Sequence, residues 1–472
     1  MASIPGSQFD ATASQTVNVV LTESGRGLDP PIAGQFNLEV YDGTGRAPNS
    51  PASGYQGLAV LQGSELSGQS LDLISGTFAI TDFGTLGADT ITAHGANETI
   101  AGGAGSAVTL NLMGSQEVAN SGVGIDTITA SGSNDTINAA DNDIVSASGD
   151  NNLIGAGLGA VVEISGKGNI LVGAGQESII IDGDGGNGII GGGNDTITVS
   201  GDSNLVYGGA GSSQYTITGS FDSVVGGGDD TFYLNGSNDT VDAGAGGSSV
   251  FVFGSKDSVT GAGNDTVNVF GSKDTITGGA GDSVVNVFGS KVEVSTGTGA
   301  DTVNVFNTHD TVTAGGGGAT INVFGSRSTV VGNTGNDTIS VNGQADVVRA
   351  GANETINVNG VMDSVTGGTG NDTINDDGFK SSISLGTGSD TVNVTGSFDT
   401  ITAGASAGTN NDQINLNGGI HHTIVDGPQV YSDTVVGFNQ AAGDRIHLTT
   451  ENVNTALANS TQIGGDTQIT LN

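Results

Sequence analysis

Residues 263–279 read GNDTVNVFGSKDTITGG, and two short runs in this stretch both begin with Asp-Thr. Apolar residues alternate with threonine and asparagine after Asp265, and again after Asp274. A period of two is typical of half-buried strands, and the glycines between the runs permit positive φ at tight corners. The stretch therefore predicts two short strands joined by tight turns.

The position of Asp274 recurs every 17 to 19 residues along most of the chain. A fixed short period indicates a repeat architecture. We therefore predict an all-β fold, a parallel β-solenoid (β-roll) of about 18 coils with two strands in each coil of 17–19 residues. The recurring positions are Glu98, Glu117, Asp135, Asn152, Asn169, Asn187, Asn204, Asp222, Asp239, Asp257, Asp274, Val292, Asp310, Ser328, Asp346, Asp363, Ser381 and Asp399.

A second column of acidic residues lies half a period away and follows glycine-rich loops. Ala107, Ser213, Ser248 and Ala319 fill gaps in it. Its acidic members are Asp89, Asp126, Asp143, Glu177, Asp195, Asp230, Asp265, Asp282, Asp301, Asp337, Glu354, Asp372 and Asp390.

Strand alternation assigns the side chains to two faces. Val267, Val269 and Ile276 are expected to point inward and form a thin aliphatic core, with Thr266 and Asn268 outside. The Asn152, Asn169, Asn187 and Asn204 positions are expected to form a hydrogen-bonding ladder along the stack.

The composition favours cations as partners and disfavours nucleic acid. The 472 residues include 84 glycines and no cysteine, and 49 acidic against 10 basic residues give a net charge of −39. Nucleic-acid binding needs Lys and Arg to neutralise phosphates. Without cysteine, the chain forms no disulfide and no thiolate metal site.

The ends of the chain differ from the repeats. Residues 1–80 carry five of the six prolines and no period, so we expect an N-terminal cap or assembly region there, followed by a solenoid over 81–430 and a C-terminal cap over 431–472. The opening MASIPGSQFD lacks the features of a cleavable signal peptide. No apolar run approaches the roughly 18 residues of a membrane-spanning helix, so no membrane insertion is expected.

The stretch GGTGNDTIN at 367–375 matches the nonapeptide Gly-Gly-x-Gly-x-Asp-x-U-x, where U is a large apolar residue. From roughly residue 85 to 445 the repeats resemble those of RTX proteins, which carry hemolysin-type calcium-binding repeats and are secreted by bacterial type I systems. This resemblance implies that two nonapeptides form one coil. It also implies that calcium sits between successive turns, held by the Asp carboxylate and glycine-loop carbonyls. Residues 433–448 resemble the C-terminal segment of type I-secreted proteins, which implies an extracellular or cell-surface location.

The carboxylates after the glycine loops would stack about 5 Å apart, and their repulsion amounts to a few kcal/mol per neighbour at an effective dielectric near 20. Calcium takes six to eight oxygen ligands, which carboxylates and loop carbonyls supply. The alternative is that these residues cap turns by accepting backbone hydrogen bonds. The predicted calcium ligands are Asp195, Asp230, Asp265, Asp282, Asp301, Asp337, Glu354, Asp372 and Asp390.

The other turn of each coil, often Gly-Ser-x-Asp, lacks a carbonyl-rich loop. A cation precedes the Asp position in several coils, and we predict Lys–Asp pairing between neighbouring coils at this edge, against an alternative of unrelated solvated charges. The cation positions are Lys256, Lys273, Lys291, His309, Arg327 and Lys380.

A phenylalanine recurs once per coil in the middle of the chain, at the end of the longer strand. Alternation from Val269 places Phe270 outside, which predicts an exposed aromatic stripe. The alternative is that the rings turn the corner and cap the core. The stripe consists of Phe253, Phe270, Phe288, Phe306 and Phe324.

No enzyme is expected. The sequence contains no HExxH motif, and the GxSxG match at 404–408 lacks the strand-to-helix turn of a hydrolase. The sequence predicts a secreted, calcium-stabilised structural protein that assembles with copies of itself, head to tail or laterally, into a surface layer, filament or biofilm matrix. A cell-surface polysaccharide is the second expected partner. The alternative function is an adhesive or ice-binding solenoid without self-assembly, suggested by outward threonine rows such as Thr275 and Thr277.

Overall fold

The computed structural model describes residues 89–102, 107–404, 411–425 and 433–447, together with the backbone of seven strands nearer the termini. The chain divides into two units, residues 1–230 and 231–472, which are described separately. The seven terminal strands are β1 (Val17–Thr22), β2 (Phe36–Asp42), β3 (Gly57–Leu61), β4 (Ser70–Leu73), β5 (Phe78–Ile80), β46 (Ser460–Ile463) and β47 (Asp466–Leu471).

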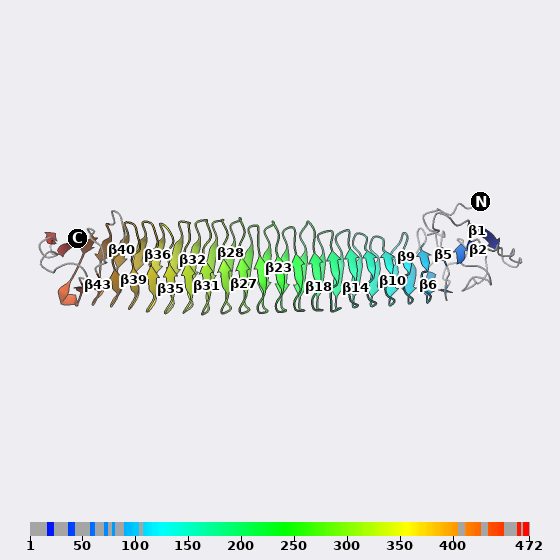
Figure 1. Cartoon of the computed structure of the whole chain (residues 1–472), viewed down its shortest axis with the longest axis horizontal. Coiled ribbons are helices and arrows are strands. Elements are labelled where there is room, and N and C mark those ends of the chain that lie inside the picture. The colour runs from blue at the N-terminus through cyan, green and yellow to red at the C-terminus, as the bar shows by residue number, and fades with distance from the viewer. Residues whose placement is uncertain are drawn as a thin grey trace. The chain divides into compact units, whose positions relative to one another are not determined.

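The fold is a parallel β-solenoid of about 19 turns with two sheets, which confirms the predicted all-β class. Each full coil contributes a longer strand to one sheet and a three-residue strand to the other, and equivalent strands of successive coils pair in parallel (Figure 1). In β26 (Thr266–Val269) and β28 (Val284–Val287), Val267 pairs with Val285 and Val269 with Val287. Each residue of a strand therefore pairs with the equivalent residue of the next coil.

The solenoid register of the first unit begins before residue 81, because β4 pairs with β6 and β5 with β7. Strands β1, β2 and β3 form a separate parallel sheet. The longer strands are β6 (Asp89–Ala93), β8 (Val108–Leu112), β10 (Thr127–Ala130), β12 (Ile144–Ala147), β14 (Val161–Ile164), β16 (Ser178–Ile181), β18 (Thr196–Val199) and β20 (Gln214–Ile217). The short strands are β7 (Thr99–Ala101), β9 (Val118–Asn120), β11 (Thr136–Asn138), β13 (Leu153–Gly155), β15 (Ile170–Val172), β17 (Gly188–Ile190), β19 (Leu205–Tyr207) and β21 (Ser223–Val225).

The second unit continues the same pattern and ends differently, since β47 pairs antiparallel with β44 and β46. Besides β26 and β28, its longer strands are β22 (Thr231–Leu234), β24 (Ser249–Val252), β30 (Thr302–Val305), β32 (Thr320–Val323), β34 (Thr338–Val341), β36 (Thr355–Val358), β38 (Thr373–Asp376), β40 (Thr391–Val394), β42 (Gln413–Leu416) and β44 (Asp433–Val436). Its short strands are β23 (Thr240–Asp242), β25 (Ser258–Thr260), β27 (Thr275–Thr277), β29 (Glu293–Ser295), β31 (Thr311–Thr313), β33 (Thr329–Val331), β35 (Val347–Arg349), β37 (Ser364–Thr366), β39 (Ser382–Ser384), β41 (Thr400–Thr402), β43 (Thr423–Val425) and β45 (Arg445–His447), and a 3-10 turn covers Gln440–Ala442.

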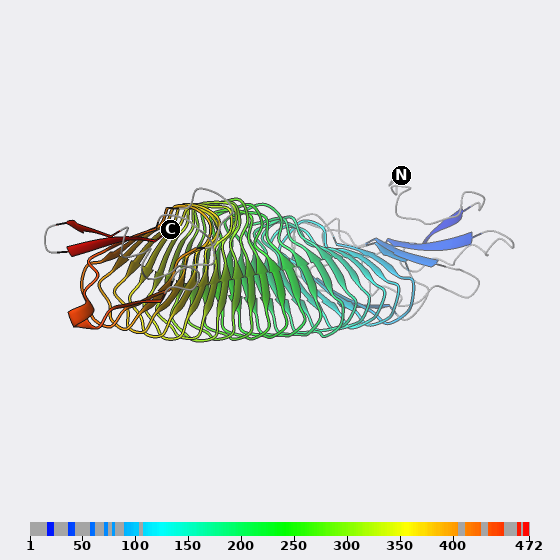
Figure 2. The ribbon, with the colours of Figure 1, turned by 60° about the vertical axis from the view of Figure 1, so that its left-hand side comes forward.

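The strands of the two sheets face each other along the coils (Figure 2). The core is a thin layer of buried, mainly aliphatic side chains contributed by the strands of both sheets. Val267, Val269 and Ile276 are buried, whereas Thr266 and Thr275 are exposed, as the alternation predicts. One acid breaks the pattern. Asp376, the last residue of β38, occupies the register position of Val358 and Val394 and is buried.

Two kinds of connection join the strands. A glycine loop, such as residues 278–283, follows most of the described short strands, and a short turn, such as residues 270–274, follows the longer strands. We call the residues directly before the longer strands the loop column, and those directly before the short strands the turn column. Within the described part of the chain, no helix is long and apolar enough to cross a bilayer.

Candidate calcium-binding loops and the two polar columns

Side chains of the loop column link successive coils by hydrogen bonds. Asp372 Oδ1 accepts the Glu354 backbone N–H at 2.8 Å, and Asp390 Oδ1 accepts that of Asp372 at 2.8 Å. The same bond recurs at most steps, with serine Oγ replacing the carboxylate at Ser213 and Ser283. In the first unit the column comprises Asp126, Asp143, Ala160, Glu177, Asp195, Ser213 and Asp230. In the second unit it comprises Ser248, Asp265, Ser283, Asp301, Ala319, Asp337, Glu354, Asp372, Asp390, Asp412 and Asp433, the last being the first residue of its strand.

Of the nine residues predicted to bind calcium, all but Asp282 lie in this column and are at most 2% exposed. Asp282 is exposed and precedes the column residue Ser283; its backbone N–H donates to Asn264 Oδ1. The reason is the order of residues in the loop. Residues 278–283 read Gly-Gly-Ala-Gly-Asp-Ser, so Ser283 takes the last loop position, which Asp301 takes in the equally long loop 296–301, and Asp282 lies one position earlier.

Several loop-column carboxylates also accept N–H groups of their own loop. Gly193 N–H donates to Asp195 Oδ2 at 3.1 Å, and Gly368 N–H donates to Asp372 Oδ2 at 3.2 Å. Glu354 Oε1 accepts the Gly351 N–H at 2.6 Å. These bonds show that the turn-capping alternative describes part of what the column does.

Other oxygens of the loop column are buried and have no hydrogen-bond partner. Burial raises the pKa of Glu354 to about 7 and that of Asp390 to about 7, with neighbouring carboxylates adding to the shift. A buried ionised oxygen without a donor is costly, and a cation offsets that cost. The unpartnered oxygens among the predicted ligands are Asp265 Oδ2, Asp301 Oδ2, Asp337 Oδ2, Glu354 Oε2 and Asp390 Oδ2.

Backbone carbonyl oxygens line the space between successive glycine loops. A Cβ atom added at Gly297 would overlap the Gly279 carbonyl oxygen, and one at Gly335 would overlap that of Gly317. No side chain fits there, so backbone carbonyl oxygens rather than side chains lie between successive loops. Among the described residues no three His, Cys, Asp or Glu side chains converge, so an ion would take most of its ligands from carbonyls. This all-oxygen set fits calcium.

The RTX calcium-binding nonapeptide repeat family model matches seven segments of the chain, residues 83–107, 120–154, 191–214, 224–250, 258–285, 326–354 and 360–378. The chain is an RTX-repeat protein. Its metal cofactor is therefore calcium, as predicted. RTX repeats are typical of extracellular proteins secreted by type I systems. No curated protein and no solved structure matches the chain.

The turn column follows the same hydrogen-bonding rule as the loop column, and every predicted member is buried. Asp274 Oδ1 accepts the Asp257 N–H at 3.0 Å, and Asp310 Oδ1 accepts that of Val292 at 2.9 Å. The asparagine ladder is confirmed: Asn169 Oδ1 accepts the Asn152 N–H at 2.8 Å, and the bonds continue to Asn187 and Asn204.

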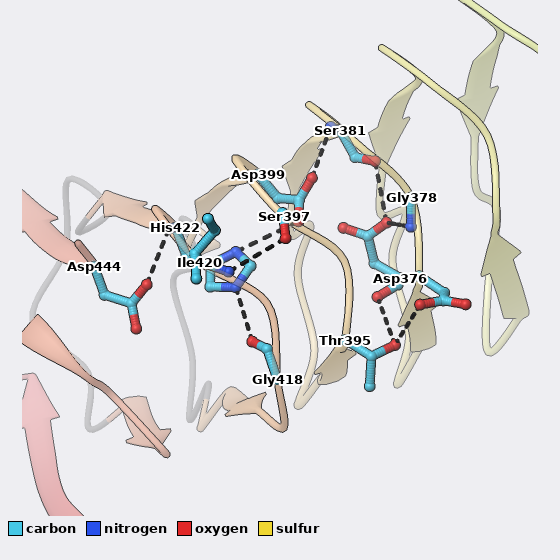
Figure 3. Close-up of polar contacts among 11 residues, drawn as sticks. Asp376, Gly378, Ser381, Thr395, Ser397, Asp399, Gly418, Ile420, His422 and Asp444 are labelled. Atoms are coloured by element: carbon cyan, nitrogen blue, oxygen red, sulfur yellow. Dashed lines mark hydrogen bonds and ion pairs between the residues drawn. The ribbon is translucent and has the colours of Figure 1, made fainter. Parts of the chain in front are cut away.

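The predicted Lys–Asp pairing at this edge is wrong. Lys256 and Lys273 have φ of 63° and 66°, and their side chains are exposed, whereas the adjacent Asp257 and Asp274 are buried. Consecutive residues of the turn thus point to opposite sides. Near the C-terminal end of the column, His422 Nδ1 lies 3.4 Å from Asp399 Oδ2 (Figure 3).

The phenylalanine stripe is exposed, as strand alternation predicts. Its five rings are 40–51% exposed, so they do not cap the core. Neighbouring rings stack with centroids 4.9–5.3 Å apart and planes within 8° of parallel. The faces of the inner rings are therefore covered by their neighbours, and the ring edges form the exposed surface.

Sequence reasoning missed the last members of both columns, because the coils lengthen there. Asp412 Oδ1 accepts the Asp390 N–H across 22 residues, and Asp444 Oδ1 accepts the His422 N–H, also across 22 residues. The available signal was a polar residue directly before an alternating strand, as in Asp412 before Gln-Ile-Asn-Leu. Ser406 of the GxSxG match lies outside the described residues.

Proposed function

We propose that this chain is a secreted, non-enzymatic structural protein that calcium stabilises and that assembles laterally with copies of itself into an extracellular layer, filament or matrix. Calcium supplies positive charge between the coils when bound. The observation that carries the assembly is the phenylalanine stripe and the cations beside it. Each of its five coils also carries an exposed cationic or imidazole side chain three residues after the ring, namely Lys256, Lys273, Lys291, His309 and Arg327.

This edge is unusual in a chain with a net charge of −39, because four of the ten Lys and Arg residues lie in these five turns. Exposed apolar stripes mark contact surfaces. Stacking of sugar rings on aromatic faces is available only at the two ends of the stripe, which disfavours a polysaccharide partner. A partner with an apolar row and negative charge at the same spacing fits better.

A second copy offers such a surface in residues 150–207. Of the four successive short turns before β13, β15, β17 and β19, three carry an exposed aspartate, Asp150, Asp184 and Asp202, and the second carries the exposed Lys167. Exposed apolar side chains of β15, β17 and β19 lie on the adjacent sheet face, including Ile170, Ile190 and Tyr207. The cationic row repeats once per coil, the acidic residues occupy three of four successive turns, and the two surfaces have predominantly opposite charge, which favours a specific register between copies.

Sedimentation velocity and negative-stain electron microscopy of the full chain in millimolar calcium test this function. We expect the natural chain to assemble and the variant K256E/K273E/K291E to stay monomeric. The variant D150N/D184N/D202N should still fold, because asparagine keeps the Oδ1 acceptors that these aspartates supply. It should assemble weakly, because it lacks their negative charge. Lys380→Glu, outside the stripe, is the matched control. A natural chain that stays monomeric in calcium would contradict the proposal.

The outward threonine surface that an ice-binding function would need is interrupted. The register places Glu293 between Thr275 and Thr311 on neighbouring short strands, so the outward threonine row is broken by a charge. Thermal hysteresis of the monomeric chain would favour this alternative over assembly.

A further inference from the structure

Non-acidic members of the turn column direct an N–H donor at a backbone carbonyl of the short turns. Asn204 Nδ2 donates to the Gly201 carbonyl at 3.0 Å, and Asn187 Nδ2 donates to that of Gly183 at 3.1 Å. His422 Nε2 lies 3.1 Å from the Gly418 carbonyl oxygen, which requires a proton on Nε2 (Figure 3). Each turn therefore presents an acceptor to the column side chain.

Aspartates place an oxygen where these residues place a nitrogen. A Cβ added at Gly166 would lie 3.0 Å from Asn169 Nδ2, and one added at the equivalent Gly271 would lie 2.7 Å from Asp274 Oδ2. Asn169 Nδ2 itself packs there without a hydrogen bond. Oδ2 is buried and without a hydrogen-bond partner in Asp257, Asp274, Asp310, Asp346 and Asp363.

An ionised Oδ2 at this position accepts no hydrogen bond, whereas a protonated Oδ2 becomes the donor that asparagine supplies in other coils. We propose that the turn column is a row of proton-binding sites. Its carboxylates take up protons in mildly acidic solution and then donate Oδ2–H to backbone carbonyls of the short turns. The proposal goes beyond the structural function above and holds whether or not the chain assembles.

The cationic side chains near Asp310 do not take the place of a proton on its carboxylate. Asp274 follows Asp257 and precedes Val292 in the column, and Asp310 lies between Val292 and Ser328. The charged or titratable groups of the turns that pack on Asp310 are Lys291, His309 and Arg327. All three are exposed, and none forms an ion pair with it.

A metal ion fits the turn column poorly. A Cβ at Gly254 would overlap the Gly236 carbonyl oxygen and lie 2.6 Å from Asp257 Oδ2, so this oxygen is packed directly on the turn backbone. Calcium would need six to eight oxygens around it. The short turn stacks one glycine position per coil on a carbonyl of the preceding turn, as Gly271 does on Gly254, whereas a glycine loop stacks two, as Gly297 and Gly299 do on Gly279 and Gly281.

Burial supports this assignment. It raises the pKa of Asp274 to about 6, of Asp310 to about 6 and of Asp346 to about 7, the last also through the neighbouring Asp363. An aspartate whose pKa is higher in the folded than in the unfolded chain stabilises the fold below its unfolded pKa. That stabilisation is lost as the pH rises through the folded pKa. The contribution of the turn column to folding stability is therefore largest near pH 4 and decreases towards pH 7.

Thermal unfolding of the full chain, followed by circular dichroism at fixed calcium and low protein concentration, tests the proposal. Asparagine mimics the protonated acid, so Asp310→Asn and Asp346→Asn should each raise Tm at pH 7.5 by about 2–4 °C and change it little at pH 5. The reverse change Asn204→Asp should lower Tm at pH 7.5 and not at pH 5. Asp282→Asn is the matched control, since Asp282 is exposed and Asn264 occupies its equivalent position one coil earlier.

Infrared difference spectra between pH 7.5 and pH 5 provide a second readout that does not depend on stability. A carboxylic-acid C=O band should appear at pH 5 and shrink in Asp310→Asn/Asp346→Asn. The proposal is overturned if these substitutions lower Tm equally at both pH values. It is equally overturned if the substitutions leave the acid band unchanged, or if Tm at pH 7.5 depends on which monovalent cation is present.

Discussion

At both edges of each coil the polar residues form the same hydrogen bond, but their negative charge is offset in two different ways. In both columns a side-chain oxygen accepts the backbone N–H of the preceding coil, as Asp372 does at the loop edge and Asp310 at the turn edge. The difference lies in what surrounds the second oxygen. At the loop edge two glycine positions of a coil stack on carbonyl oxygens of the preceding loop, as Gly297 and Gly299 do on Gly279 and Gly281, whereas at the turn edge one does. The local backbone, rather than the carboxylate, decides between a cation and a proton.

Calcium removal should have the largest effect, because it removes the ions from every calcium site of the loop edge at once. The turn edge should not respond to it. Each site held at about 100 times its dissociation constant adds about 2.7 kcal/mol, so several sites together rival the stability of a typical domain. We expect chelation to abolish the β-sheet circular dichroism signal or lower Tm strongly, and calcium but not magnesium to restore it. An unchanged Tm after chelation would contradict calcium stabilisation of the loop edge.

Matched substitutions in one coil separate the two edges. Asp337 belongs to the loop column and Asp346 to the turn column, and both are about 1% exposed. Asp337→Asn should weaken calcium binding at the affected site about tenfold, or about 1.4 kcal/mol, in isothermal titration calorimetry. Asp346→Asn should leave calcium binding unchanged. Equal losses from both substitutions would mean that the edges are chemically alike.

Removal of the acid from the core should stabilise the fold. Asp376 is buried between Val358 and Val394, its Oδ2 has no hydrogen-bond partner, and burial raises its pKa to about 6. Its Oδ1 accepts from Ser381 Oγ at 3.0 Å, which offsets part of this cost. We expect Asp376→Val to add about 1–3 kcal/mol at pH 7.5 and less at pH 5. A large loss of stability in chemical denaturation would show that Asp376 holds the nearby turn.

Substitution of His422 should have the smallest effect. Burial lowers its pKa, but the nearby Asp399 carboxylate and the hydrogen bond to the Gly418 carbonyl outweigh that effect and leave the pKa raised. Because the pKa is raised on folding, the stabilisation is present below about pH 6.5 and is lost as the pH rises through the folded pKa. His422→Asn should therefore lower Tm at pH 6 and change it little at pH 8. Equal changes at both pH values would indicate that protonation of His422 plays no part.

The sequence predicts the membership of both columns wherever the coil length stays constant. Period-two alternation placed Val267 inside and Phe270 outside, and the 17–19-residue spacing aligned the turn column from Glu98 to Asp399. The errors arise where an aspartate stands one position before the last residue of its loop, at Asp282, or where the coils lengthen, at Asp412 and Asp433. A period locates a residue in a row, but it does not fix the local φ.

The direction of the lysine side chains shows that limit. Lys273 and Asp274 are adjacent in sequence, and opposite charges at one edge suggested pairing. The positive φ of Lys273 turns its side chain towards solvent while Asp274 is buried. The facing carbonyls at the turn edge also depend on backbone orientation, so the difference between a cation site and a proton site could not be predicted from the Asp and Gly residues alone.

The most direct test is a crystal structure of the full chain grown with calcium near neutral pH, with the ions located by anomalous scattering. Calcium is predicted between successive glycine loops, beside Asp265, Asp301, Asp337 and Asp390, with no ion beside Asp274 or Asp310. Ions at the turn edge, or glycine loops without calcium, would contradict the division of the two edges between cation and proton.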